Sequence, residues 1–514
     1  MCQHCLNRRE FHGLAAAGVA AGMAGLSASL HAAEQTPEPW DPDKPLVVTG
    51  KPLRVQPILM HARYAPREKT SWRSWSSIIN EPAAAEEMKR IQGELDALAK
   101  RAPFPLQLLP LAKVTAPDQG AALQQGDFDV VLLFAATGGG DLFRACAAKQ
   151  PERDTILFVR HKSGPTYYWY ECFGTRAAKV PTPESIRENS VRNHGGVTID
   201  DCVVDDYGEV LWRLQALYGL KNFVGQRIVA VGGAGGKWDS RAPAVAREQY
   251  LLDIAEVSYA QLAPRLKAAL ADPQRLALAQ QWTDRYLALP KTRLETKKEY
   301  VRNAVVLYMV FKDLMREHRA PAMTINACMG TIMPMADSTA CLTLSWLNDE
   351  GLLAFCESDF VIIPCGIFLH YIAGLPVFLH NSTFPHKGIV TCAHCTGPRR
   401  MDGKRYEPVR IMTHYESDFG AAPKVEMPIG QPVTFVDPEY TTGRWLGMKG
   451  IVRDNPCFDI CRSQQDVEIC GQWKKLLAEA RDSHWMMAYG DHLQKLGYAA
   501  RKIGIQWIDL SEGV

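Results

Sequence analysis

The alternation of short apolar runs with amphipathic helical segments constrains the fold of this chain more than any other feature. In the first half, strand-like apolar runs are followed by stretches such as residues 83–101, in which apolar residues recur at helical spacing. Strands that alternate with helices favour parallel sheets with helices on both faces, the doubly wound arrangement. The strands expected on this basis cover residues 55–60, 106–111, 128–134, 227–231 and 322–327.

The pattern changes near residue 401, where short alternating segments separated by glycine and proline replace the helical spacing. Residues 409–413 and 432–436 are of this kind, which is typical of small sheets and barrels. We therefore expect an α/β protein with two doubly wound parallel-sheet domains and a C-terminal β-rich, barrel-like domain. A length of 514 residues agrees with three domains. Their expected bounds are 53–204, 205–400 and 401–514, after a linker at residues 34–52.

The N-terminus has the features of an export signal. Arg8 and Arg9 precede Phe11 and a weakly apolar run over residues 14–30 that is rich in alanine and glycine. Paired arginines ahead of such a segment are typical of the twin-arginine route, which carries folded proteins. Residues 1–33 are therefore expected to engage the twin-arginine export machinery and to direct the protein to the periplasm. If the signal is not cleaved, it would anchor the protein in the membrane.

The net charge argues against a nucleic-acid partner, and the cysteine content bears on disulfide formation. A formal net charge of +2 over the whole chain gives no strong field, so no nucleic-acid partner is expected. Of the 14 cysteines, Cys2 and Cys5 lie in the expected signal. The remaining even number permits disulfides in an oxidising compartment without indicating any pairing.

Two acidic residues interrupt the most apolar part of the second half. Glu357 and Asp359 lie between apolar runs at residues 351–354 and 361–363. A carboxylate in such a setting is costly unless it is paired, hydrogen-bonded or bound to a metal. The alternative is that the two acids cap a helix that begins near Phe360.

Three segments together resemble the L-fucose/L-arabinose isomerase superfamily. Glu357 stands in a Glu-x-Asp segment like that of L-fucose isomerases, and Asn381 follows it by 24 positions, after a glycine and a short strand. His484 precedes a Tyr-Gly-Asp and a helix, as the third family ligand does. Further similarity lies at residues 341–351 and 429–434. The resemblance covers roughly residues 55–509 and is closest to the shorter relatives of L-fucose isomerase.

The resemblance implies a divalent metal held by Glu357, Asn381 and His484, and a homo-oligomer. This mixed oxygen and nitrogen set suits Mn²⁺, with Mg²⁺, Fe²⁺ and Zn²⁺ as alternatives. The family has an aspartate where this chain has Asn381; an amide oxygen can still bind a hard cation, but an amide cannot act as a base. The simpler alternatives are that Asn381 begins a turn with Ser382 and that His484 is a packed or capping histidine.

Isomerisation through an enediol needs a cation beside a group that moves a proton between neighbouring carbons. By resemblance, Glu357 is the first candidate for this acid/base role. Because Asn381 cannot be the second proton-transfer group, Asp359, His380 or His386 would have to supply it, and otherwise isomerase chemistry fails.

A loop rich in histidine and basic residues follows Asn381. His394 and Cys395 resemble the His-Cys-Gly loop of the family, with Thr396 in place of the glycine, and His394 is therefore a further catalytic candidate. The loop could bind an acidic sugar or a carboxylate product. The substrate-binding candidates are His386, Lys387, Arg399 and Arg400. The simpler alternative is a solvated turn whose Cys392 and Cys395 are paired or free.

These observations lead us to expect a metal-dependent enzyme that acts on a small-molecule carbohydrate, as an aldose–ketose isomerase or epimerase. One alternative is an exported sugar-binding protein without turnover, which Asn381 supports. Another is a metal-assisted lyase or hydrolase that acts on modified sugars. The sequence does not distinguish the sugar.

Overall fold

The computed structural model describes residues 40–171, 178–439, 443–480 and 482–512. The helices and strands below lie within the compact unit Asp43–Val514. The expected export signal at residues 1–33 lies outside the described residues. Among the residues that are described, no helix has both the length and the apolar character needed to cross a membrane.

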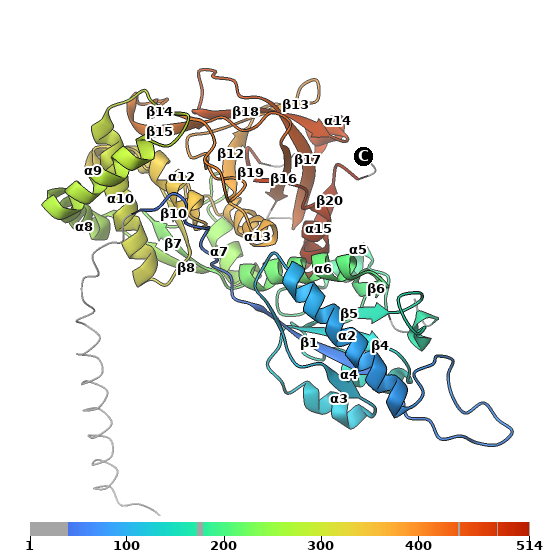
Figure 1. Ribbon diagram of the computed structural model, residues 1–514. Coiled ribbons are helices and arrows are strands. Elements are labelled where there is room, and N and C mark those ends of the chain that lie inside the picture. The colour runs from blue at the N-terminus through green and yellow to red at the C-terminus, as the bar shows by residue number, and fades with distance from the viewer. Residues whose placement is uncertain (1–39, 172–177, 440–442, 481, 513–514) are drawn as a thin grey trace, which may run out of the picture. The chain divides into compact units, whose positions relative to one another are not determined.

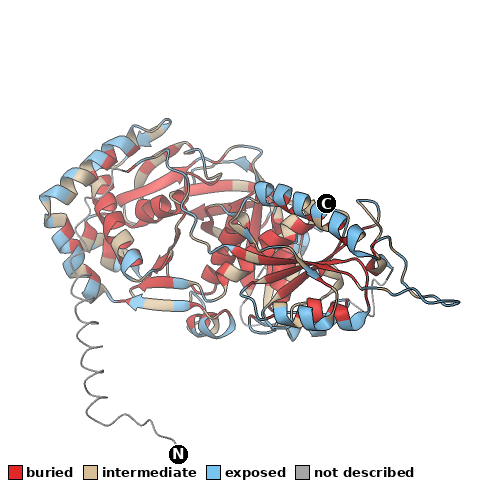
Figure 2. Cartoon of the chain, turned by 60° about the horizontal axis from the view of Figure 1, so that its bottom comes forward, coloured by how far each residue is buried: buried red, intermediate tan, exposed pale blue. Residues whose placement is uncertain are grey.

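The first domain is built on a six-stranded parallel sheet in the order β2-β1-β4-β5-β6, with β3 also beside β1. Its strands are β1 (Leu53–Met60), β2 (Leu106–Leu108), β3 (Ala112–Val114), β4 (Val130–Ala135), β5 (Asp154–Val159) and β6 (Cys202–Val204). Its helices are α2 (Glu81–Arg101), α3 (Pro117–Leu123), α4 (Gly140–Cys146) and α5 (Pro183–Arg187). Every residue of β4 and β5 is buried, whereas the helices expose their outer faces, as Figure 2 shows. Strands without polar alternation are expected when helices cover both faces of a sheet.

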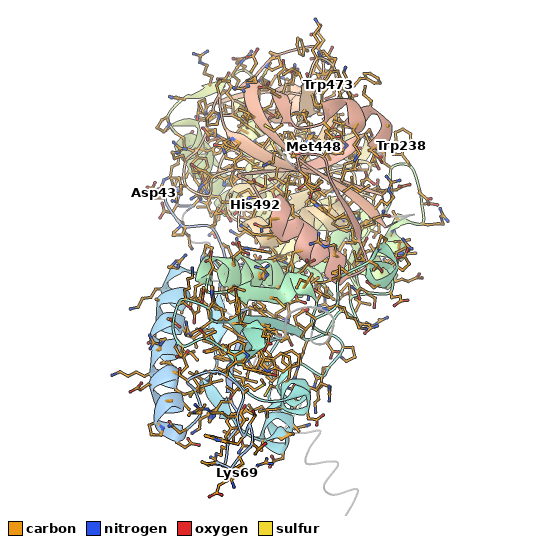
Figure 3. All side chains as sticks on the ribbon, turned by 90° about the vertical axis from the view of Figure 1, so that its right-hand side faces the viewer. Asp43, Lys69, Trp238, Met448, Trp473 and His492 are labelled. Atoms are coloured by element: carbon orange, nitrogen blue, oxygen red, sulfur yellow. The ribbon has the colours of Figure 1, made fainter. Side chains whose placement is uncertain are left out.

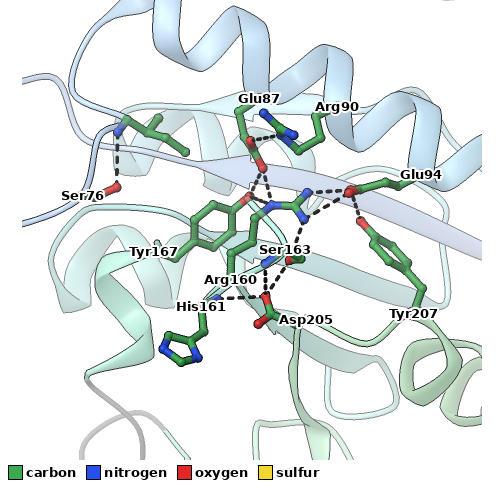
Figure 4. Close-up of polar contacts among 11 residues, drawn as sticks. Ser76, Glu87, Arg90, Glu94, Arg160, His161, Ser163, Tyr167, Asp205 and Tyr207 are labelled. Atoms are coloured by element: carbon green, nitrogen blue, oxygen red, sulfur yellow. Dashed lines mark hydrogen bonds and ion pairs between the residues drawn. The ribbon is translucent and has the colours of Figure 1, made fainter. Parts of the chain in front are cut away.

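A buried ionic network fixes helix α2 to this sheet. Arg160, which follows β5 and is fully buried, donates from Nε to Glu87 at 2.5 Å and from both terminal nitrogens to Glu94, at 3.1 and 2.5 Å (Figure 4). The Tyr167 hydroxyl donates to Glu87 at 2.5 Å and the Tyr207 hydroxyl donates to Glu94 at 2.6 Å. Burial and the neighbouring Glu87 raise the pKa of Tyr167 well above its ordinary value, so the hydroxyl keeps its proton.

The second domain has a four-stranded parallel sheet in the order β11-β10-β7-β8. Its strands are β7 (Arg227–Val231), β8 (Asp253–Val257), β10 (Ala322–Ile325) and β11 (Leu353–Phe355). Its helices are α6 (Tyr207–Phe223), α7 (Ala242–Gln249), α8 (Tyr259–Ala271), α9 (Pro273–Leu287), α10 (Lys298–Glu317), α11 (Cys328–Ala336) and α12 (Cys341–Asp349). Helix α9 begins directly after α8 because Asp272 accepts from the amides of Gln274 and Arg275 and caps α9 ahead of Pro273.

A closed six-stranded antiparallel barrel follows, in the order β16-β19-β12-β13-β18-β17, and the pairing of β16 with β17 closes it (Figure 1). Its strands are β12 (Phe378–Ser382), β13 (Ile389–His394), β16 (Pro432–Glu439), β17 (Arg444–Asp454), β18 (Ser463–Cys470) and β19 (His484–Tyr489), with β20 (Gln506–Asp509) parallel to β17. Helices α13 (Ile363–Ala373), α14 (Trp473–Glu479) and α15 (Leu493–Lys502) accompany it. A separate three-stranded sheet joins β14 (Val409–His414) to β15 (Phe419–Val425) and β9 (Thr292–Leu294).

The expected fold class is confirmed: an α/β protein with parallel sheets and a β-rich C-terminal domain. The barrel, however, begins at β12, before the boundary expected at residue 400. The start of the barrel could not be predicted because helix α13, which precedes it, is buried from Ile363 to Ile372. This helix packs against α6, β16 and β19. An apolar helix of this kind gives no periodic signal that separates it from the strands around it.

We predict that Arg160→Met lowers stability by about 3 to 5 kcal/mol, because it leaves the buried Glu87 carboxylate without its fully buried partner. Thermal denaturation followed by circular dichroism measures the change. The matched control is Arg144→Met, which removes an exposed pair with Asp141 and should change stability by less than about 1 kcal/mol. Equal losses in the two variants would contradict the structural role of the network.

Candidate metal centre

The loop after β11 is held in a conformation that non-glycine residues rarely adopt. Glu357 and Ser358 have φ values of 63° and 49°, in the left-handed region. The glycine turn after β7 holds the loop: the amide of Gly235 donates to the Ser358 carbonyl at 3.1 Å, and the Ser358 hydroxyl donates to the Gly233 carbonyl at 2.8 Å. As a result the Glu357 side chain is 41% exposed at a cavity wall, whereas Asp359 is fully buried.

Asp359 orients other groups of the site and does not itself line the cavity. Its carboxylate accepts from the amides of Lys237 at 2.9 Å and Val361 at 3.2 Å, and from Nδ1 of His484 at 2.8 Å. Helix α13 begins later, with Ile362 in the capping position. Asp359 is therefore a hydrogen-bonded carboxylate of the interior and is not the capping residue of α13.

His484 is the first residue of β19 and is fully buried. Because a carboxylate only accepts hydrogen bonds, the contact with Asp359 places the ring proton on Nδ1. Nε2 then carries the free lone pair and lies 2.9 Å from Nζ of Lys237 and 3.7 Å from Oε2 of Glu357. A carboxylate behind the far nitrogen of an imidazole is the usual support of a metal-binding histidine.

His394, the last residue of β13, completes the cluster. Its Nε2 lies 3.5 Å from Oε1 of Glu357, and its Nδ1 lies 3.0 Å from the hydroxyl of Thr396. The Thr396 hydroxyl therefore gives Nδ1 a partner that a glycine at this position could not supply. One ligand atom from each of Glu357, His394 and His484 lies within 4.8 Å of the others.

Asn381 lies beside these residues in the register of the barrel. It is opposite His484 of β19 and Ala393 of β13, within strand β12, and it lines the same cavity. It does not begin a turn. His380, one residue earlier, packs with Phe378, Phe435 and Trp485 because neighbouring side chains of a strand point to opposite faces. Burial lowers the pKa of His380 to about 3, so it stays neutral in the core.

The donor set fits a divalent cation of the first transition series. Two imidazoles and a carboxylate suit Mn²⁺, Fe²⁺ and Zn²⁺, and the amide oxygen of Asn381 can add a fourth ligand. Burial would raise the pKa of Glu357, but the hydrogen bond with His394 and the positive charge of Lys237 hold it well below its usual range. The Lys237 ammonium lies 3.2 Å from Oε2 of Glu357, so a positive charge already faces these ligand atoms.

The cluster lies on the wall of a cavity of about 950 Å³, large enough for a sugar-sized molecule. Its walls come from the β7 turn, the start of α11, the barrel strands β12 and β13, and the ends of β14 and of the loop before β18. The cavity is also lined by the polar residues Asn326, Thr331 and Glu416. Trp238, next to Lys237, is 72% exposed and lies at the molecular surface (Figure 3).

The four residues proposed from the sequence to bind substrate lie elsewhere, and none of them lines this cavity. His386 and Lys387 form an exposed turn between β12 and β13. Arg399 and Arg400 are buried, and their amides donate to the Asp349 carboxylate at 2.6 and 2.7 Å. Their side chains donate to backbone carbonyls, such as those of residues 407 and 403, so they hold the chain together and do not face a ligand.

Lys237 lines the cavity beside the cluster, and the sequence did not predict it as a site residue. It closes the glycine-rich turn after β7, a turn that matches no phosphate-binding or dinucleotide-binding pattern. The only available signal was a lysine at the carboxyl end of a parallel strand, where α/β folds place ligands. Its contacts with Glu357 and His484 join residues far apart in the chain.

Comparison with known proteins adds no family to this geometry. No protein-family model matches the chain, and a search of curated proteins finds no match. The resemblance at residues 356–359, 374–381 and 484–491 is therefore a basis for proposals about function.

We predict that Asp359→Asn weakens divalent-metal binding about 10- to 100-fold, because the amide can no longer fix the Nδ1-protonated form of His484 as a carboxylate does. Isothermal titration of chelator-treated protein with Mn²⁺ measures the affinity. The control is Asp466→Asn, which neutralises the carboxylate that accepts from the Thr391 hydroxyl in the barrel and leaves the cluster intact. Unchanged affinity in Asp359→Asn would show that His484 needs no such support.

Proposed function

We propose that this protein is a metal-dependent enzyme acting on a carbohydrate, as an aldose–ketose isomerase or epimerase. The observation that carries the proposal is the convergence of Glu357, His394 and His484, with His484 oriented by Asp359, on the wall of a sugar-sized cavity. The resemblance to the L-fucose isomerase superfamily supports it, because Glu357 and His484 are two of the three ligands that it implies.

In this proposal Glu357, His394, His484 and Asn381 hold a divalent cation, Mn²⁺ by preference. A cation bound there would polarise the carbonyl and hydroxyl oxygens of a sugar. His394 takes a ligand position that the resemblance did not assign, beside Asn381, which brings no negative charge. The second imidazole therefore compensates as a donor atom, though not as a charge, for the aspartate that the family has.

Glu357 is the group we assign to proton abstraction, since its carboxylate lines the cavity within the metal-ligating cluster. Of the partners that the sequence offered, Asp359 is fully hydrogen-bonded, His380 lies in the core and His386 lies on an exposed turn. Lys237 takes their place in the proposal. Its ammonium lies beside Glu357, so it can stabilise a developing negative charge on substrate oxygen or return a proton.

Two observations favour a second candidate function, an exported sugar-binding protein without turnover. Asn381 removes a charge from the ligand set, and the Lys237 ammonium pairs with Glu357 and contacts His484, where a metal would also have to bind. A binding protein would need the cavity but neither a cation nor proton transfer.

Deuterium incorporation separates the two candidates. Protein reloaded with Mn²⁺ and incubated in D₂O with a panel of pentoses, hexoses and uronic acids should place deuterium at the carbon next to the carbonyl of at least one sugar. Glu357→Gln should lower this rate about 100-fold or more, because it removes the base. The matched control is Glu416→Gln, an acid of the same cavity wall that lies outside the cluster.

Metal analysis of the same preparations completes the test. Glu357→Gln and His484→Ala should each retain less metal than the wild type, whereas Asn381→Asp should retain at least as much. Sugar binding without deuterium incorporation or bound metal would favour the binding protein. Metal binding without deuterium at that carbon would favour a lyase or hydrolase.

A further inference from the structure

A second cluster of metal-ligating side chains lines the same cavity and takes no part in the proposed reaction. Cys341 begins α12, Cys395 follows β13, and His414 ends β14. All three are buried, with 5%, 2% and 7% exposure. One ligand atom from each lies within 4.8 Å of the others, the spacing of groups that can share one ion.

The surroundings of the cluster leave ligand atoms available. Nδ1 of His414 is buried and has no hydrogen-bond partner, which is costly for an imidazole nitrogen unless something occupies the place beside it. Cys461, from the loop before β18, packs against Cys341 and Cys395 and lines the cavity with them. The four cysteine and histidine side chains therefore come from four separate segments, and their thiols are free in the structure.

We propose that Cys341, Cys395 and His414 bind a thiophilic divalent cation, zinc by the chemistry of the set, with Cys461 as the fourth ligand. Two or three sulfurs with one imidazole form a common tetrahedral set for zinc. The set differs in kind from the oxygen and nitrogen ligands of Glu357, His394 and His484, and softer thiolates select against Mn²⁺ and Mg²⁺. Each thiol that binds releases its proton to solvent, and no oxidant or reductant is required.

The thiol site lies next to the cluster of Glu357, His394 and His484 along strand β13. His394 and Cys395 are consecutive, so one cation on each side of their peptide bond would fix the end of β13 from both directions. The thiol site would also join α12 and β14 to the barrel, because its ligands belong to all three. We therefore expect zinc to stabilise the cavity wall whether or not the neighbouring centre is loaded.

Cobalt(II) substitution tests the proposal without measuring activity. Chelator-treated, reduced wild-type protein titrated with Co²⁺ should develop a thiolate-to-cobalt charge-transfer band in the near ultraviolet, which added Zn²⁺ abolishes. Cys341→Ser and Cys395→Ser should each lose or strongly weaken the band. Glu357→Gln and His484→Ala should keep it, so failure of this site and failure of the proposed function are distinguishable.

The control is Cys146→Ser, which replaces an equally buried cysteine in the first domain and should leave the band unchanged. Circular dichroism establishes that each variant folds, and His414→Ala, which should shift or weaken the band, provides an independent variant should a cysteine replacement unfold. The proposal is overturned if reduced wild-type protein shows no such band, or if the band survives in both cysteine variants. A disulfide that joins any two of Cys341, Cys395 and Cys461 in protein isolated without reductant would also overturn it.

Discussion

The hydrogen bond between Asp359 and His484 is the interaction on which the rest of the site depends. It joins a loop of the second parallel sheet to a strand of the barrel, at 2.8 Å and out of contact with solvent. A buried carboxylate needs donors, and Asp359 finds them in two backbone amides and this imidazole. The same bond sets the tautomer of His484 and directs Nε2 toward Glu357. The hydrogen bond that stabilises the buried Asp359 carboxylate therefore also leaves the Nε2 lone pair of His484 able to bind a metal.

Backbone strain gives this arrangement its geometry. Two successive residues, Glu357 and Ser358, occupy the left-handed region, which costs about 1 kcal/mol or more for each residue. The glycine turn after β7 holds them there through two hydrogen bonds with Ser358, one accepted by its carbonyl and one donated by its hydroxyl. Strain of this kind separates the two acids: Glu357 turns to the cavity and Asp359 turns inward. Without it, two acids spaced by one residue in an extended segment would point to the same side.

Local patterns in the sequence predicted most of the fold. The strand expected at residues 227–231 has the bounds of β7, and the amphipathic segment at 83–101 lies within α2. The barrel starts at β12, ahead of the change of pattern near residue 401, because the buried helix α13 gives no periodic signal. Within the site, Glu357, Asn381 and His484 could be proposed from short motifs, whereas Lys237 could not, since its partners lie far away in the chain. The cluster of Cys341, Cys395, His414 and Cys461 could not be predicted for the same reason. These residues have no common spacing in the sequence, and only the packing of four segments brings them together.

Diffraction from crystals of manganese-loaded protein, recorded at the manganese absorption edge, shows whether Glu357, His394 and His484 share one cation. We expect one anomalous peak about 2.0 to 2.3 Å from the Glu357 carboxylate and from Nε2 of both His394 and His484. We also expect Nζ of Lys237 to withdraw from the place it holds between Glu357 and His484. The absence of a peak at these atoms, with the lysine still in contact with both residues, would rule out the shared metal site.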